Sequence, residues 1–182
     1  MYAFDKNGTL VGKTPALFGK AVGDVIPKSA LEKSVGETRE AEKITPAGQF
    51  EGTMVPNESY GTAVDFLHMP NSYLAIHRVY LGNPKEGRLG RLASEDPAAR
   101  RISYGCINVP YAFYDNVMTK HFDGKSRVIV LPETGTLEQT FPMMSKAINE
   151  RVVETPKPTE YAAAPSWGEA QPGLPKQEQI GR

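Results

Sequence analysis

Two runs of β-branched and aromatic residues constrain the fold of this chain more than any other feature. They cover Gly61–Met69 and residues 72–80, and Met-Pro-Asn-Ser at positions 69–72 supplies a connecting turn between them. The pattern predicts two strands joined by that turn. Residues 82–101 then form a polar stretch with two prolines and three glycines, which predicts a long loop.

The remaining segments add more strands and a few helices. Asn7-Gly8 predicts a tight turn between strands at residues 2–4 and 9–11, and residues 127–131 predict a short buried strand. Helices are expected near residues 29–35, over residues 111–121 after Pro110, and from a Thr136 cap to about residue 152, bent or shortened by Pro142. Within residues 111–121, the pattern turns Phe113, Val117 and Tyr114 inward. The expected class is mainly β, a β-rich mixed architecture.

The length of 182 residues fits one domain, which we expect over residues 1–152. Residues 153–182 hold five of the fifteen prolines and few large apolar side chains. Such a segment buries too little surface to offset its ordering entropy, which predicts a disordered tail.

The charge balance excludes some classes of partner. The chain carries 21 basic and 21 acidic side chains, so no long-range field favours nucleic acid. No apolar stretch approaches the roughly 18 residues of a membrane span. The chain opens without a charged-then-apolar leader, so a cytosolic protein and a mature form that has lost its leader both fit the sequence.

Cys106 is the single cysteine, so it forms no internal disulfide, and three scattered histidines do not complete a zinc-finger site with it. It fits a small buried hydrophobe, an incidental thiol or a nucleophile. Cys106 precedes the helix expected after Pro110, whose dipole would lower the pKa of the thiol. Gly105 permits a tight turn, and the N–H groups of Gly105 and Cys106 would then hold an oxyanion. Asn108 offers an amide to substrate or a cap to the helix.

A thiol nucleophile needs a base, and the candidates are His68, His77 and His121. His121 ends a predicted helix, where a cation complements the dipole, and His68 fits a packing or surface position. His77 lies in the strand before the segment that leads to Cys106. His77 is therefore the expected base, although a histidine in a strand also fits a structural role.

Three motifs together resemble those of the L,D-transpeptidase catalytic domain, or YkuD domain. They are Ile-Thr-Pro-Ala-Gly-Gln-Phe at residues 44–50, Ile76-His77, and Ser-Tyr-Gly-Cys-Ile-Asn at residues 103–108. The resemblance spans roughly residues 2–131. It implies a mostly β fold in which the strands of the cysteine and the histidine meet at one end of a β-sandwich or curled sheet.

The resemblance also implies roles for individual residues. Cys106 matches the nucleophile, His77 the base, Arg78 the residue whose carbonyl orients the imidazole, Gly105 the oxyanion-hole glycine, and Ser103 and Asn108 polar substrate-binding positions. Tyr104 replaces the family's usual histidine beside the thiol, and its hydroxyl can still donate a hydrogen bond. The separation of His77 from Cys106 exceeds the family's usual spacing. Residues 82–101 would then form a lid that supplies no catalytic group but whose arginines pair with the carboxylates of the substrate. The alternative is a solvated surface insertion.

The implied function is acyl transfer from peptidoglycan stem peptides through a Cys106 thioester. Water as acceptor would make the same site an L,D-carboxypeptidase, and a catalytically silent peptidoglycan-binding module is a further alternative. Carbapenem-type inhibitors are expected to acylate Cys106. Neither a metal nor an organic cofactor is required, since thiol and imidazole supply the nucleophile and the proton transfers. The implied location is the periplasm or the cell wall.

Overall fold

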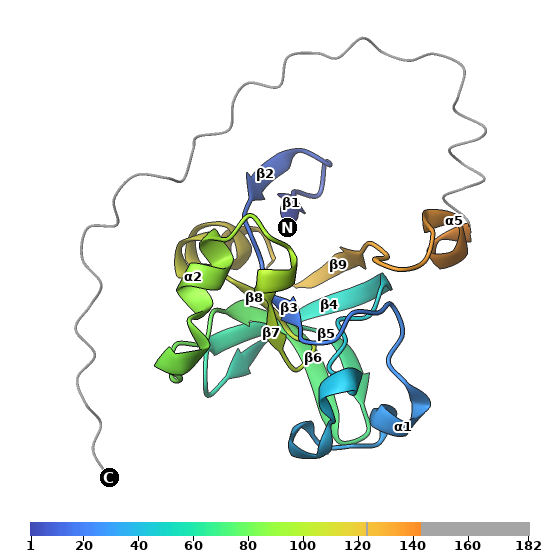
Figure 1. The fold of residues 1–182 in the computed structure, drawn as a ribbon. Coiled ribbons are helices and arrows are strands. Elements are labelled where there is room, and N and C mark those ends of the chain that lie inside the picture. The colour runs from blue at the N-terminus through green and yellow to red at the C-terminus, as the bar shows by residue number, and fades with distance from the viewer. Residues whose placement is uncertain (123, 143–182) are drawn as a thin grey trace. The chain divides into compact units, whose positions relative to one another are not determined.

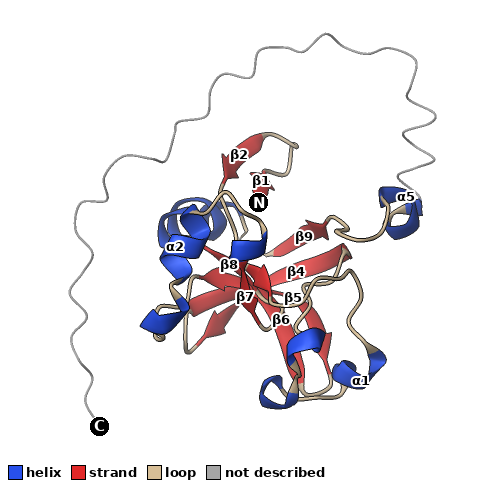
Figure 2. Cartoon of the chain, viewed as in Figure 1, coloured by secondary structure: helices blue, strands red, loops and turns tan. Residues whose placement is uncertain are grey.

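The structure, a computed structural model, describes residues 1–122 and 124–142. These residues form a β-rich fold with a curled five-stranded sheet and a few short helices (Figure 2). The strands are β1 Tyr2–Phe4, β2 Leu10–Lys13, β3 Phe18–Gly19, β4 Gly48–Asn57, β5 Gly61–Met69, β6 Ser72–Arg78, β7 Arg101–Ser103, β8 Ile107–Val109 and β9 Lys125–Val130. The helices are α1 Lys28–Leu31, α2 Arg88–Ala93, α3 Tyr111–Phe113, α4 Thr119–His121 and α5 Leu137–Thr140, with 3₁₀ turns η1 Val35–Glu37, η2 Glu40–Glu42, η3 Pro84–Glu86 and η4 Ala98–Arg100 and the π-helical turn η5 Tyr114–Met118.

The five-stranded sheet has the order β8-β6-β5-β4-β9. The predicted pair of strands is present as β5 and β6, which run antiparallel, although β6 ends at Arg78 instead of reaching residue 80. β8 runs parallel to β6, and its Ile107 and Asn108 lie opposite Ile76 and His77. Because side chains alternate across a sheet, Ile76 and Ile107 share one face while His77 and Asn108 share the other.

The hydrophobic core lies against the face that carries Ile76 and Ile107. The helical stretch from α3 to α4 covers it, and Phe113, Tyr114 and Val117 of this stretch are buried as the sequence pattern predicts. Pro110 caps the stretch instead of occupying its first turn. The core face is therefore closed, and the opposite face is left to form a site.

Residues 82–101 are not the structureless loop that their polarity predicts. They form η3, α2 and η4, and Leu92 of α2 packs against Leu17, Val79 and Ile102 (Figure 1). A six-residue helix is marginal by itself, so this contact with the rest of the fold stabilises it.

Other predicted elements differ in detail. β1 and β2 form the expected hairpin, with a positive φ at Gly8. The helix expected near residues 29–35 is divided into α1 and η1. Thr136 caps α5, where its hydroxyl accepts the N–H of Gln139 at 3.2 Å. The expected extension of this helix toward residue 152 and the predicted tail at residues 153–182 lie outside the described residues.

Thr45 joins three distant segments through one buried hydroxyl. Its Oγ1 donates to the carbonyl of Gly105 at 2.8 Å and accepts the N–H of Gly19 at 2.9 Å. Both partners are buried backbone groups, which are costly to leave unpaired. This hydroxyl therefore fixes the turn that precedes β8 against β3.

We expect Thr45→Val to lower the free energy of unfolding by about 2–6 kcal/mol, because two buried backbone groups lose their partner at about 1–3 kcal/mol each. Thr45→Ser keeps the hydroxyl and is the matched control. Urea unfolding of both variants measures the difference. A larger loss for serine than for valine would show that the methyl group, and not the hydroxyl, carries the effect.

Candidate active site

A groove of about 550 Å³ opens on the sheet face that carries His77 and Asn108. Its size suits a small organic or peptide ligand. Five of the seven residues singled out from the sequence line it: His77, Ser103, Tyr104, Cys106 and Asn108. The sixth, Arg78, contacts the His77 ring through its carbonyl. Gly105, the seventh, lies in the turn beneath Cys106.

His77 is held by the contact that the resemblance implies. Its Nδ1 lies 2.7 Å from the carbonyl oxygen of Arg78, so the proton resides on Nδ1 and that carbonyl accepts it. His77 is only 4% exposed. Burial lowers the pKa of His77 to about 4, against the opposing effect of the Arg78 carbonyl, and the positive charge of Arg88 lowers it further. The imidazole is therefore neutral near pH 7.

One neighbour that sequence reasoning missed, Tyr60, also holds the imidazole. Tyr60 stacks on His77 with ring centroids 3.8 Å apart. The side chain of Arg78 donates to the carbonyl of Tyr60 at 2.6 Å and pairs with Asp115 at 2.5 Å. Tyr60 stands in the turn between β4 and β5, where Asn57 lies opposite Gly61, and turn residues there were the only sequence signal for it.

Asn108 links the imidazole to a buried arginine. Its Nδ2 lies 3.2 Å from His77 Nε2, and its Oδ1 accepts a hydrogen bond from Nη1 of Arg88. Asn108 is fully buried and belongs to β8, so it does not cap the helix that follows. The amide is thus part of a continuous buried hydrogen-bonded chain.

The expected activation of Cys106 by a helix dipole is wrong. Residues 107–109 form β8 and pair with β6, so a whole strand separates Cys106 from α3. The effect of a helix dipole falls off within the first turn, so the helical stretch that begins with α3 does not reach the thiol across β8. Burial raises the pKa of the Cys106 thiol, the N–H of Ala75 opposes this, and Asp65 raises it further. Cys106 therefore rests as a thiol.

The turn that carries Cys106 uses most of its own hydrogen-bonding groups. The Ser103 hydroxyl donates to the carbonyl of Cys106 at 2.6 Å and accepts the N–H of Gly105 at 3.1 Å. Gly105 has φ +125°, and a Cβ there would lie 2.7 Å from the carbonyl oxygen of Ile44, so only glycine fits. The Gly105 N–H is thus engaged inside the turn. Among the described residues, no acceptor for the Cys106 N–H is found.

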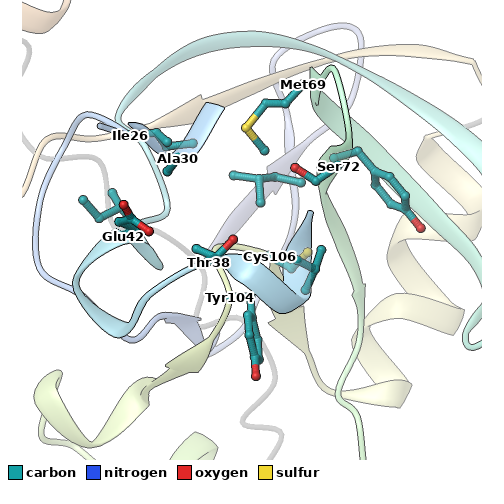
Figure 3. A pocket seen from close by; sticks show the side chains of 12 residues that line it. Ile26, Ala30, Thr38, Glu42, Met69, Ser72, Tyr104 and Cys106 are labelled. Atoms are coloured by element: carbon teal, nitrogen blue, oxygen red, sulfur yellow. The ribbon is translucent and has the colours of Figure 1, made fainter. Parts of the chain in front are cut away.

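A smaller cavity of about 70 Å³ adjoins the other side of Cys106. Ile26, Thr38 and Met69 from separate segments surround it, whereas the ring of Tyr104 points away (Figure 3). Lys43 Nζ lies 3.8 Å from the centroid of that ring. Tyr104 is therefore held at the rim by a cation–π contact.

Residues 82–101 contribute one arginine to the site. Arg91 donates to the carbonyls of Glu86 and Ala99, and Arg100 donates to that of Ser94. Arg101 donates to the carbonyls of Gly19 and Ala21. The three arginines thus stabilise backbone instead of presenting charge to a ligand, and only Arg88 lines the groove.

The other two histidines are exposed. His68 is an exposed surface residue of β5 at the edge of the groove, with Nε2 3.9 Å from Asp65 Oδ2. His121 ends α4 and is exposed, and the groove lining does not include it. Of the three histidines, His77 alone is buried in the groove beside the cysteine turn.

Residues 1–122 and 124–142 contain neither a metal-binding cluster nor a membrane-spanning helix. No three His, Cys, Asp or Glu side chains gather there in an arrangement able to hold a metal ion. Within the same residues, no helix has the length and apolar character needed to cross a membrane.

Comparison with known proteins yields no matching family model, no matching curated protein and no matching solved structure.

Alkylation of Cys106 by iodoacetamide tests its thiol state. We expect the pH midpoint of the rate to lie above that of an ordinary cysteine, about 8.5, because burial disfavours the thiolate. The same chain in denaturant, which removes that burial, is the control. A folded midpoint below the denatured one would contradict a buried, protonated thiol.

Acid stability tests the burial of His77. The pKa of His77 is about 4 in the folded chain and about 6.5 when unfolded, so the unfolded chain binds a proton more readily between these values. Stability from the neutral imidazole is full above pH 6.5 and is lost as the pH falls toward 4, by about 3 kcal/mol.

Urea unfolding of the wild type and His77→Gln at pH 7 and pH 4 isolates this contribution, since the variant lacks the titrating ring. We expect the wild type to lose more stability than the variant on acidification. Parallel losses in the two proteins would show that the imidazole is accessible to protons in the fold.

Proposed function

We propose that this protein is a cysteine acyltransferase of L,D-transpeptidase type that acts on peptidoglycan stem peptides. Cys106 is the nucleophile and His77 the base. The observation that carries the proposal is the orientation of His77, whose Nδ1–H is taken by the Arg78 carbonyl. Only Nε2 then remains to accept a proton, and His77 shares the groove with Cys106.

The first half-reaction forms a thioester. His77 Nε2 gives up its contact with Asn108 Nδ2 and takes the proton of the Cys106 thiol, as the sulfur attacks the carbonyl carbon that precedes the terminal D-residue of the stem. The tetrahedral intermediate carries a negative oxygen, for which the Cys106 N–H is the backbone donor not engaged within the turn. The C–N bond then breaks, and the leaving amine takes the proton from His77.

The second half-reaction resolves the thioester. An acceptor amine gives its proton to His77 Nε2 and attacks the acyl carbon, and the departing sulfur of Cys106 recovers that proton. The product is a cross-link. Water in place of the amine gives hydrolysis, the L,D-carboxypeptidase alternative. A general-base sequence suits this site because the resting pair is thiol and neutral imidazole instead of thiolate and imidazolium.

The groove supports a peptide as substrate. Tyr60 and Tyr73 offer flat aromatic surfaces, and Asn57, Ser59, Asn71 and Ser72 offer polar groups along the same groove. The proposal includes the sheet-and-site fold of that family, a periplasmic or cell-wall location, and acylation of Cys106 by carbapenem-type inhibitors. The resemblance of the motifs at residues 44–50, 76–77 and 103–108 to those of the L,D-transpeptidase domain supports the proposed fold, location and acylation.

Incubation with a tetrapeptide stem, alone and with an amine acceptor, tests the proposal by mass spectrometry of the products. We expect loss of the terminal D-residue with a cross-linked product, no turnover by Cys106→Ala, and a fall of about 10²–10⁴ in rate for His77→Ala.

His121→Ala is the matched control, since His121 lies outside the groove. It should retain the wild-type rate. Loss of the D-residue without cross-linking would favour the L,D-carboxypeptidase. No reaction by a folded wild type that still retains the stem peptide would favour the silent peptidoglycan-binding module.

A further inference from the structure

Arg88 reaches the site from α2, an element outside the motifs that suggest the chemistry. It is 9% exposed. Its Nε donates to Glu86 Oε2 at 2.5 Å, its Nη1 donates to Asn108 Oδ1, and its guanidinium carbon lies 5.5 Å from the centroid of Tyr80. Leu92 anchors the same helix in an apolar cluster. The guanidinium is therefore held firmly at the back of the groove.

The donor chemistry of Arg88 fixes every hydrogen bond beyond it. A guanidinium has only N–H donors, so the Asn108 atom that faces it is the oxygen, and the atom that faces His77 is Nδ2. Nδ2 is also only a donor, so His77 Nε2 accepts. The proton of the neutral ring then resides on Nδ1 and is donated to the Arg78 carbonyl. The chain Arg88–Asn108–His77–Arg78 thus has one direction throughout.

The same direction opposes protonation of the ring. An imidazolium would place an Nε2–H donor against the Nδ2–H donor of Asn108. Rotation of the amide would relieve that contact only by turning Nδ2 toward Arg88, a second donor-to-donor contact. The positive charge of Arg88 adds to the effect, as the lowered pKa of His77 reflects.

We propose that Arg88 is a positioning residue that acts through Asn108: it fixes the amide so that His77 rests uncharged with its proton on Nδ1. The significance for catalysis rests on the proposed function, but the state of the ring does not. The neighbouring thiol of Cys106 is protonated because it is buried, and the positive charge of Arg88 opposes this by lowering the pKa of the thiol.

Other charged or titratable groups do not supply this polarity. Tyr60 faces the ring from the β4–β5 turn through its aromatic face, and Cys106 approaches from the segment before β8. Arg78, next in β6, contacts the ring through its carbonyl, while its guanidinium is directed to Asp115 and Tyr60. Asp65 of β5 is buried, with one carboxylate oxygen 3.9 Å from His68. Among the described residues, Arg88 alone contacts Asn108 from the side opposite to the imidazole.

Long-range ¹H–¹⁵N NMR of the histidine rings tests the proposal without any substrate. With three histidines in the chain, His68→Gln and His121→Gln variants assign the His77 signals. In the wild type we expect an Nδ1–H tautomer and a titration midpoint near the lowered pKa of about 4. In Arg88→Met we expect a mixture of tautomers and a midpoint moved up toward the ordinary value of about 6.5.

Three further variants separate positioning from general damage. Arg91→Met removes backbone hydrogen bonds of the same helix, touches no site residue and should leave the midpoint unchanged. Arg88→Lys keeps a charged donor but lacks the planar guanidinium that binds Glu86 and Asn108 at the same time. We therefore expect a His77 titration midpoint between those of the wild type and Arg88→Met. Asn108→Asp presents an acceptor to both neighbours and should raise the midpoint with Arg88 in place, which keeps the test available if Arg88→Met does not fold.

A wild-type tautomer and midpoint in folded Arg88→Met, or a shift of equal size in Arg91→Met, would overturn the proposal. An unchanged midpoint in Asn108→Asp would overturn it as well. Turnover is measured separately: the acidic limb of kcat/KM should move to higher pH in Arg88→Met along with the NMR midpoint. A moved midpoint in a protein that does not process stem peptides would sustain the role of Arg88 and remove the proposed function.

Discussion

The parallel pairing of β6 with β8 is the constraint on which the site depends. It sets His77 opposite Asn108 and places the cysteine turn at the start of β8. Parallel neighbours cannot be joined by a tight turn; they require a crossover of a dozen or more residues, usually with a helix. The segment from β6 to β8 contains that helix, α2. Strand direction therefore requires a long separation between His77 and Cys106, and residues 82–101 form part of that crossover.

The pairing of β6 with β8 also explains which parts of the fold can be predicted from the sequence and which cannot. The hairpin of β5 and β6 follows from β-branched runs and a turn, and burial of Phe113 and Val117 follows from helical spacing, because both are local patterns. α2 is invisible to the same reasoning, since its six residues gain stability only where Leu92 meets distant residues. Residues 107–109 looked like the approach to a helix, and became a strand only because β6 offers them an edge.

The residues of the candidate site also divide into those that the sequence predicts and those that it does not. Cys106 and His77 are recognisable by residue type and order, and their grouping in one groove follows from the pairing of β6 with β8. Tyr60, stacked on the imidazole, carries no signal in a single sequence because its role arises from the curl of β4 and β5 around β6. The electrostatic state was also beyond the sequence: burial, a tertiary property, raises the pKa of the thiol and lowers that of the base.

These opposite shifts and the internally bonded turn have a common consequence for catalysis. A site that stored a thiolate would need several donors around the sulfur; the Ala75 N–H is one, but the Gly105 N–H is taken by the Ser103 hydroxyl. The bond between Ser103 and Gly105 stabilises the position of the turn, not a charge on the sulfur. In the reaction that we propose, negative charge is therefore best accommodated once it has passed from sulfur to a substrate oxygen near the Cys106 N–H. A rigid turn beside a neutral imidazole would then favour the transition state over the resting thiolate, which is the differential stabilisation that catalysis requires.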